Sequence, residues 1–259
     1  MSDFLKEIKS GVGVIKINRP KVYNALTRDA KLELISMIRE LNRNEEVKAI
    51  ILTGEGNAFC TGQDLNDRTI QGNGPSVDLG LTLETEWNPL VMSLRESSKI
   101  TLAAINGVVA GAGISLALAC DLVIAKPQVK FVSGFSKIGL CPDAGSTMIF
   151  TNALGPKLAM EFFLFSLPLY SEDLKACGLV NKIAEDYLDE SKKWAGEIAK
   201  MAPLSLRAIK KNVLSAADIT FSQSMERETV TQRYLGNSLD YQEGLRAFFE
   251  KRTPEFKGR

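Results

Sequence analysis

The feature that most constrains the fold is a series of short apolar runs that alternate with helical patterns through the first half of the chain. The clearest runs cover residues 12–17, 48–54, 100–105 and 122–125. Runs of this length without a polar alternation are typical of strands buried on both faces. Strands of this kind separated by helices predict an α/β fold in which helices cover the faces of a sheet.

The segments between these runs have helical or loop character. An apolar stripe containing Leu34 and Ile38 predicts a helix over residues 27–41. Residues 66–80 are rich in Gly, Asn, Asp and Pro, and we expect them to form a loop. A second helix is expected over residues 83–96.

Beyond residue 145 the strand patterns nearly vanish and helical patterns replace them. Helices are expected over residues 156–165, 171–177, 189–201, 203–214, 222–235 and 240–250. This change divides the chain into a core over residues 1–200 and a helical carboxyl-terminal region over residues 201–259.

Composition excludes several classes of function. The chain has 32 basic and 31 acidic residues, so no strong field attracts nucleic acid. The amino terminus has no signal-peptide pattern, and no apolar segment reaches the length of a membrane span. We therefore expect a cytoplasmic protein that binds neither nucleic acid nor a membrane.

The absence of histidine limits the chemistry further. It removes catalytic mechanisms of the Ser-His-Asp and Cys-His types and nearly all catalytic zinc sites. The four cysteines are widely spaced and form no CxxC pair, which argues against a metal site and a disulfide framework. Proton transfer must therefore rely on carboxylates, Lys, Tyr or water, assisted by backbone dipoles.

Two segments bring an apolar strand to a tight turn of small residues. They are Phe59-Cys-Thr-Gly-Gln-Asp-Leu65 and Ile105-Asn-Gly-Val-Val-Ala-Gly-Ala-Gly-Ile114. Glycine lets the backbone approach a ligand closely, so the N–H groups of Gln63 and Ala112 are candidate donors to a developing oxyanion. The alternative is that these small residues only permit close packing of a helix on a strand. A dinucleotide fingerprint fails because Leu116 stands where its third glycine belongs.

Taken together, several motifs resemble the enoyl-CoA hydratase/isomerase, or crotonase, superfamily. The motifs are residues 18–20 and 24–26, 58–65, 105–113, 119–122, 131–147, 243–248 and 251–252. The resemblance covers essentially the whole chain. It implies a spiral of ββα units, a carboxyl-terminal helical region that packs between subunits, and a homotrimer or a hexamer built as a dimer of trimers. It also implies an acyl-CoA thioester substrate, with no metal and no cofactor beyond the CoA of that substrate.

The resemblance also assigns binding residues. The thioester oxygen is expected between the backbone N–H groups of Gln63 and Ala112. The residues expected to bind CoA are Lys21, Val22, Ala25, Thr61, Asp64, Leu65 and Lys251. Lys251 and the adjacent Arg252 are expected near the CoA phosphates, and the alternative for both is a solvated charge on a terminal helix.

The departures from the family pattern indicate the type of reaction. Hydratases of this superfamily carry two glutamates that handle the added water, and Ser115 and Phe135 occupy the matching positions here. A carboxylate is instead present at Asp143, at or beside the position where isomerases and dehalogenases of the superfamily place theirs. The alternative role for Asp143 is the N-cap of a helix that begins near Ala144.

The sequence therefore predicts an acyl-CoA isomerase in which Asp143 carries the proton. Segments such as residues 62–68, 88–91, 135–140 and 240–244 resemble the branch that isomerises ring-1,2-epoxyphenylacetyl-CoA and also shifts enoyl-CoA double bonds. The alternatives are a β-oxidation enoyl-CoA hydratase that recruits Glu84 or Glu86, a dehalogenase, and a non-catalytic acyl-CoA-binding member. Three aromatic residues are candidates for the acyl pocket, although we expect them to fill the core: Trp87, Phe135 and Phe150.

Overall fold

The computed structural model describes residues 2–68 and 77–259. In this part of the chain the strands form two sheets. The larger sheet has the order β1 (Phe4–Lys9), β2 (Val12–Ile17), β3 (Ala49–Gly54), β5 (Ile100–Ile105), β7 (Leu122–Ala125) and β10 (Lys182–Ile183). The smaller sheet has the order β4 (Ala58–Cys60), β6 (Val108–Ala110), β8 (Lys130–Val132) and β9 (Leu169–Tyr170).

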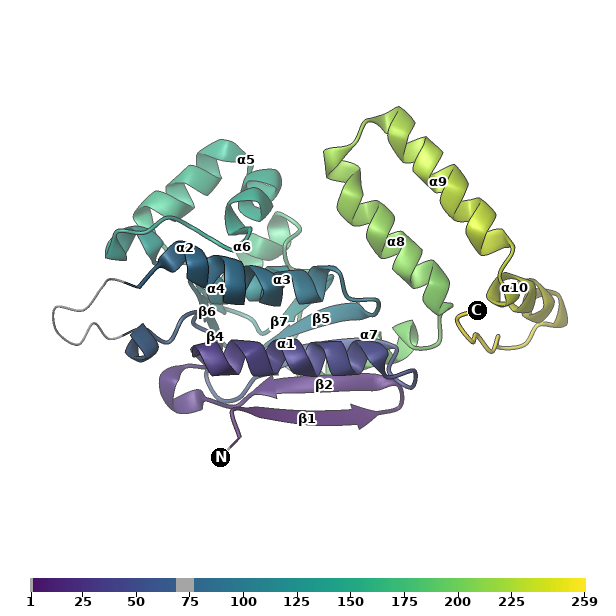
Figure 1. The fold of residues 1–259 in the computed structure, drawn as a ribbon, viewed down its shortest axis with the longest axis horizontal. Helices are drawn as coiled ribbons and strands as arrows, with labels where there is room; N and C mark the ends of the chain where they lie inside the picture. The colour runs from purple at the N-terminus through teal and green to yellow at the C-terminus, as the bar shows by residue number, and fades with distance from the viewer. Residues whose placement is uncertain (1, 69–76) are drawn as a thin grey trace.

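Helices surround the sheets and then continue alone toward the carboxyl terminus (Figure 1). The α-helices are α1 (Arg28–Arg43), α2 (Leu79–Thr82), α3 (Asn88–Arg95), α4 (Ala112–Leu118), α5 (Ser146–Phe165), α6 (Ser171–Ala176), α7 (Tyr187–Ile198), α8 (Pro203–Ser215), α9 (Phe221–Gly236) and α10 (Leu239–Glu250). Short 3₁₀ turns are η1 (Pro20–Val22), η2 (Leu65–Arg68), η4 (Phe135–Ile138) and η5 (Ala216–Asp218), and η3 (Leu83–Trp87) is a π-helical turn.

The chain moves repeatedly from the larger sheet to the smaller sheet. It passes from β3 to β4, from β5 to β6 and from β7 to β8, and each pair is followed by a helical segment. The three strands in each sheet are parallel to one another. These successive ββα turns confirm the predicted α/β fold with a ββα spiral core.

The central strands of the larger sheet are largely apolar because both faces of that sheet are buried. Along β5, Ala103 and Ile105 belong to the main core with α1 and α3, whereas Leu102 and Ala104 pack with α7 on the other face. Every residue of β3 is buried in the same way. A parallel sheet with helices on both faces leaves no solvent side, so polar alternation has no place in these strands.

Most predicted strands and helices are present, with bounds close to those expected. The predicted strands at residues 12–17, 100–105 and 122–125 have the observed bounds, and Thr27 is the N-cap of α1, accepting a hydrogen bond from the Ala30 N–H at 3.2 Å. The strand β1 was missed because only Phe4 is buried, while polar and apolar residues alike are exposed along the rest of it. The first half of α5 was also missed. It precedes a kink at Gly155, and this interruption hid the helical pattern.

The predicted loop over residues 66–80 falls largely outside the described residues. Its described ends are η2 and the beginning of α2.

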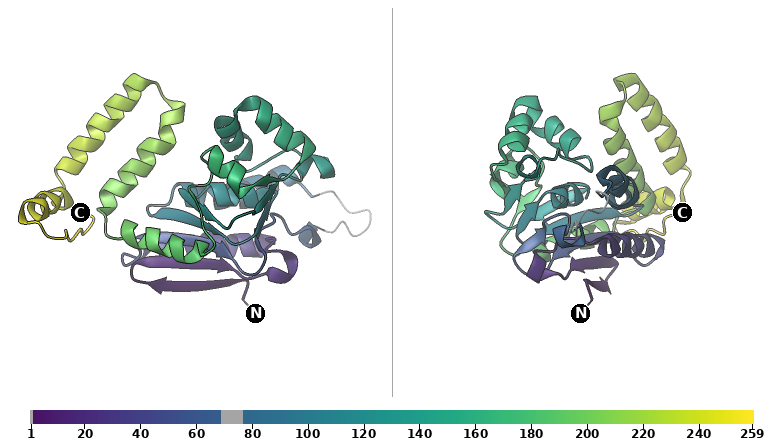
Figure 2. Two further views of the ribbon diagram at one scale, coloured as in Figure 1. Left: turned by 180° about the vertical axis from the view of Figure 1, so that it is seen from behind. Right: turned by 60° about the vertical axis from the view of Figure 1, so that its left-hand side comes forward.

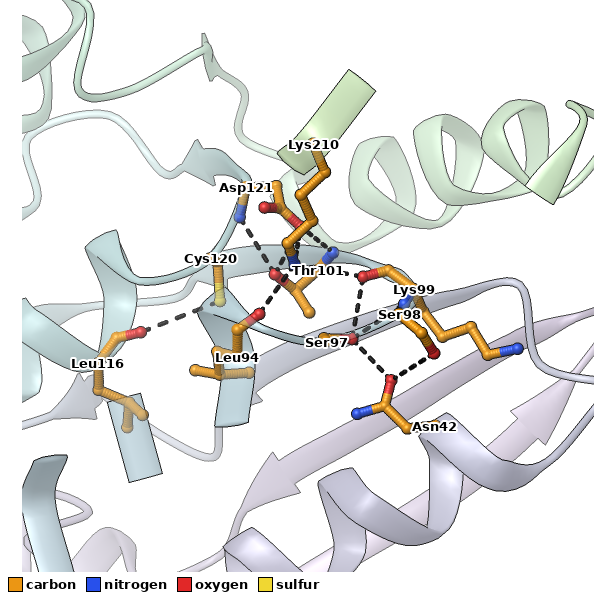
Figure 3. A network of polar contacts seen from close by, with 10 residues as sticks. All are labelled: Asn42, Leu94, Ser97, Ser98, Lys99, Thr101, Leu116, Cys120, Asp121 and Lys210. Atoms are coloured by element: carbon orange, nitrogen blue, oxygen red, sulfur yellow. Dashed lines mark hydrogen bonds and ion pairs between the residues drawn. The ribbon is translucent and has the colours of Figure 1, made fainter. Parts of the chain in front are cut away.

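The helices α8, α9 and α10 extend away from the two sheets (Figures 1 and 2). A buried ion pair fixes α8 to the core: Lys210 Nζ lies 2.8 Å from Asp121 Oδ2 and also donates to the carbonyl of Leu94 (Figure 3). The same carboxylate oxygen accepts hydrogen bonds from the backbone and side chain of Thr101. A helical carboxyl-terminal region is therefore present and anchored. In the described residues, no helix has both the length and the apolar character needed to span a bilayer.

Candidate active site

A pocket of about 400 Å³ lies at the carboxyl ends of three neighbouring parallel strands. Thr61 and Gln63 follow β4, Gly111 and Ala112 follow β6, and Ser133 follows β8. In α/β proteins this end of a parallel sheet is the usual position of a ligand site, because the loops there are free to vary. The helical segment from α2 through η3 and the loop that ends at Asp143 complete the lining.

The two turns that were predicted to donate hydrogen bonds lie against each other. A Cβ atom on Gly62 would lie 3.0 Å from the Ala112 nitrogen, and one on Gly113 would lie 2.1 Å from the Cys60 carbonyl oxygen. Gly62 also has φ +88°, a conformation that side chains disfavour. Glycine is therefore required at both positions for the turns to approach this closely.

The backbone of Gln63 is oriented by a bridge to Leu26. The Leu26 N–H donates to the Gly62 carbonyl at 2.8 Å, and the Asp64 N–H donates to the Leu26 carbonyl at 3.0 Å. Successive peptide groups of an extended chain point to opposite sides, so the intervening Gln63 N–H is directed away from Leu26. The Ala112 N–H belongs to the first turn of α4, where no intrahelical acceptor exists. Both residues line the pocket, as an oxyanion-binding pair requires.

Asp143 also lines the pocket and is half-buried. The alternative of a helix N-cap is wrong, because α5 begins at Ser146 and its N-cap is Gly145, with no capping bond from a side chain. The backbone carbonyl of Asp143 accepts hydrogen bonds from Ser115 Oγ at 3.0 Å and from the N–H and Oγ of Ser146 at 3.0 and 2.9 Å. Three donors on one carbonyl fix the backbone that carries the carboxylate.

Ser115 links the two halves of the site, because it belongs to α4, the helix that begins with Ala112. We expect Ser115→Ala to lower kcat about tenfold and to leave KM nearly unchanged, since Asp143 loses a restraint while Ser115 itself does not line the pocket. Steady-state kinetics with an enoyl-CoA substrate measure both constants. An unchanged kcat would show that the bonds from Ser146 position the carboxylate without Ser115.

Glu84 and Glu86 lie outside the pocket in different environments. Glu86 is buried and forms an ion pair with Lys31, and Glu84 is exposed. Neither residue is part of the lining, and among the described lining residues only Asp143 has a carboxylate. The two acids considered for a hydratase are thus placed elsewhere.

The aromatic residues divide between pocket and core. Phe150 is fully buried and stacks on Phe162 with ring centroids 4.7 Å apart, as expected for a core residue. Trp87 and Phe135 are buried, but they also line the pocket, so a purely core role was the wrong expectation for them. Phe135 thus replaces a polar group of the hydratase pattern with an apolar wall.

Most of the predicted CoA-binding residues lie close together. Thr61 and Leu65 line the pocket, and Lys21 and Val22 form the turn η1. The segment of η1 is held against the turn after β4: Thr61 Oγ1 donates to the Tyr23 carbonyl at 3.1 Å.

The ion pair between Arg19 and Asp64 reinforces this contact. Arg19 Nη2 lies 3.0 Å from Asp64 Oδ2, and Arg19 also donates to the carbonyl of Ala25. Lys251, in contrast, follows the last residue of α10 at the far end of the molecule from β4 and β6 (Figures 1 and 2). A single chain therefore does not bring Lys251 to the pocket.

The cysteines differ in burial and in their position relative to the pocket. Burial raises the pKa of Cys60 and the pKa of Cys120 to about 12, so both remain protonated thiols at neutral pH. Cys141 is exposed and lines the pocket beside Asp143.

A buried polar network holds the side chain of Gln63, in the turn after β4, and the sequence did not predict it. Lys31 on α1 is completely buried, pairs with Glu86 on η3, and donates to Gln63 Oε1 at 2.6 Å. Trp87 Nε1 donates to the same oxygen at 3.2 Å. A signal was present, because Lys31 lies three and seven residues before Leu34 and Ile38 and so interrupts the apolar stripe of α1.

Comparison with known proteins agrees with this architecture. Residues 7–259 match the family model described as enoyl-CoA hydratase/isomerase. The chain is 36% identical to 1,2-epoxyphenylacetyl-CoA isomerase of Escherichia coli, with 100% of both chains covered. It is 28% identical to 2,3-dehydroadipyl-CoA hydratase of the same organism, again over 100% of both chains.

A solved structure supports the same assignment. An enoyl-CoA hydratase from Polaromonas sp. JS666 aligns with a TM-score of 0.89 and 30% identity, and the alignment covers 98% of this chain and 99% of that one. The family model spans nearly the whole chain, and the fold and the full-length relatives agree with it. The chain therefore belongs to the enoyl-CoA hydratase/isomerase, or crotonase, family of enzymes.

Proposed function

We propose that this chain is an acyl-CoA isomerase in which Asp143 moves a proton between two carbons of the acyl group. The observation that carries the proposal is the position of Asp143 as the only carboxylate among the described lining residues, in the same pocket as Gln63 and Ala112. An addition of water normally needs two acid–base groups, whereas a double-bond shift needs one group that takes and returns the same proton.

The proposed mechanism has two steps. The thioester oxygen accepts hydrogen bonds from the backbone N–H groups of Gln63 and Ala112, and Asp143 removes a proton from the acyl chain to give an enolate. The donors stabilise the negative charge on oxygen, an effect for which one donor is worth about 3 kcal/mol. Asp143 then returns the proton to a different carbon as the enolate collapses. The double bond moves, and the substrate gains and loses no atoms.

We propose that the substrate is ring-1,2-epoxyphenylacetyl-CoA, a 3-enoyl-CoA, or both. Support comes from the name of the Escherichia coli relative, which covers the full length of this chain. The walls of the pocket also fit an apolar or aromatic group, because Leu83, Trp87, Phe135 and Leu140 all contribute to them. Since the chemistry uses only the thioester and these protein groups, we propose that CoA enters with the substrate and that no other cofactor takes part.

Isotope exchange tests the proposal directly. Incubation of 2-enoyl- and 3-enoyl-CoA in heavy water is expected to introduce deuterium into the acyl chain and to move the double bond, as measured by mass spectrometry. Formation of 3-hydroxyacyl-CoA would instead identify a hydratase, the activity in the name of the second Escherichia coli relative. Binding of acyl-CoA without exchange or migration would identify a non-catalytic member.

Self-association is the second part of the proposal, and we expect a homotrimer or a hexamer. The carboxyl-terminal helices expose large apolar side chains, among them Phe221, Phe248 and Phe249, which are 83%, 76% and 77% exposed. Large exposed aromatic side chains are enriched at interfaces between proteins. The remote position of Lys251 agrees with this, because its contact with CoA phosphates would require a second chain.

Light scattering after size-exclusion chromatography is expected to give a mass of three or six chains of 28.4 kDa each. The double variant Phe248→Asp/Phe249→Asp is expected to shift the mass toward one chain, because it places charges on the proposed interface. Leu5→Asp, on the exposed face of β1, serves as the control and should keep the assembled mass. A wild-type protein with the mass of one chain would contradict the proposal.

A further inference from the structure

Ser133 has a hydroxyl group whose hydrogen-bonding capacity is not used within the described residues. It lies just after β8, lines the pocket and is 1% exposed. Its Oγ is buried and has no hydrogen-bond partner in the part of the chain that the structure describes. A buried polar group without a partner costs about as much as a lost hydrogen bond, so the position calls for a ligand or a bound water.

The other neutral polar side chains of the lining are bonded to protein. Thr61 Oγ1 donates to the Tyr23 carbonyl, and the side chains of Gln63 and Trp87 bond to each other. Hydroxyl groups that follow Ser133 in the chain or pack beside it also have partners: Ser136 Oγ donates to the Leu164 carbonyl, and Ser166 Oγ accepts from the Gly134 N–H. The hydroxyl of Ser133 therefore differs from its surroundings.

The location of Ser133 separates it from the thioester site. The candidate oxyanion donors follow β4 and β6, and Ser133 follows β8, the next strand of the same sheet. Neighbouring strands lie about 4.8 Å apart, so Ser133 is roughly one strand spacing beyond Ala112 and two beyond Gln63. Ser133 therefore lines a part of the pocket beyond the oxyanion donors, where the acyl group and not the thioester carbonyl would lie.

A contact between the Ser133 hydroxyl and a bound ligand requires a rotation about χ1. The Oγ atom has almost no solvent contact in the present rotamer, but no hydrogen bond within the described residues holds it there. Serine has three staggered rotamers, so Oγ can leave its present position without breaking a hydrogen bond within the described residues.

We propose that Ser133 donates a hydrogen bond to an oxygen atom that the acyl group carries away from its thioester, such as a ring epoxide or ether oxygen. The pocket then selects oxygen-bearing acyl groups over hydrocarbon chains. The described lining residues beside Ser133 that carry larger side chains are Val132 and Phe135, and both are apolar. This inference rests on the proposed isomerase function and narrows its substrate class.

The test compares two substrates of the wild type and of Ser133→Ala: ring-1,2-epoxyphenylacetyl-CoA and 3-hexenoyl-CoA, which has no oxygen beyond the thioester. The ratio of kcat/KM for the epoxide to kcat/KM for the hexenoyl compound is expected to fall about tenfold in the variant. Thermal stability is expected to stay the same or rise, because an unpaired buried hydroxyl has been removed. Ser136→Ala, which removes a hydroxyl outside the pocket lining, should leave the ratio unchanged.

An unchanged ratio in Ser133→Ala would overturn the inference. A clear loss of thermal stability would also overturn it, since it would show that the hydroxyl binds a structural water. Wild-type turnover of 3-hexenoyl-CoA without turnover of the epoxide would reject this inference and keep the proposed isomerase. Failure of the wild type with both substrates would reject the two together.

Discussion

Asp143→Asn is expected to lower the rate of double-bond migration by about a hundredfold to ten-thousandfold, the usual contribution of a general acid–base group. The amide has the same shape as the carboxylate but cannot take up and return a proton. Because the backbone carbonyl of Asp143 is held by Ser115 and Ser146, the loop should keep its position in the variant. The change therefore isolates the proton transfer from the binding of the substrate.

The measurement is deuterium incorporation and double-bond migration in heavy water, for the wild type and the variant. Thermal unfolding and the dissociation constant for a non-reactive acyl-CoA analogue show whether the fold and the pocket are intact. Glu84→Gln is a matched control, since it neutralises an exposed carboxylate that does not line the pocket, and it should react at the wild-type rate. Full activity of Asp143→Asn would place the proton carrier on another residue.

The same variants separate isomerase from hydratase chemistry. A hydratase that used Glu84 would lose activity in Glu84→Gln and keep it in Asp143→Asn. Glu86 has a different constraint, because its carboxylate already pairs with the fully buried Lys31. Phe135, which the family resemblance matches to the second glutamate of hydratases, lines the pocket and cannot orient water.

Much of the fold was accessible from the sequence because buried parallel strands leave a simple signal. Ile100–Ile105 is apolar except for Thr101 because both of its faces are covered, and its bounds were predicted correctly. The spiral arrangement came from the resemblance to a family and not from periodicity. The strand β1 has only one buried residue, Phe4, so its pattern was too weak to detect.

The site was predictable where it depends on local backbone and unpredictable where it depends on distant contacts. The turns at Gly62 and Gly111 follow from local glycine patterns. The bond from Ser115 to Asp143 joins positions 28 residues apart, and it exists only because α4 packs beside the loop before α5. Sequence spacing gives no measure of such a contact, so Ser115 was identified only as a missing glutamate.

The network around Lys31 is the second such case, and it gives the largest expected effect on stability. Lys31→Met is expected to lower the free energy of unfolding by about 3–5 kcal/mol, because Glu86 keeps its charge in a buried position after its closest partner is removed. Arg28 compensates only in part, since its Nε lies 3.8 Å from Glu86 Oε1 and its side chain is mostly exposed. The midpoint of thermal unfolding should fall on the order of 10 °C for a domain of this size.

The double variant Lys31→Met/Glu86→Leu is the control that separates the lost ion pair from the stranded charge. Removing both charges is expected to restore most of the stability, because a well-packed apolar pair is commonly as stable as a buried ion pair. The rate of double-bond migration should nevertheless stay below that of the wild type, because Gln63 has lost the bond from Lys31 that holds its side chain. Calorimetry and steady-state kinetics on the wild type, Lys31→Met, Glu86→Leu and the double variant measure both effects. If Lys31→Met were as stable as the wild type, the charge of Glu86 would have to be solvated in solution. If the double variant reacted at the wild-type rate, the bond from Lys31 would not be what fixes the position of Gln63.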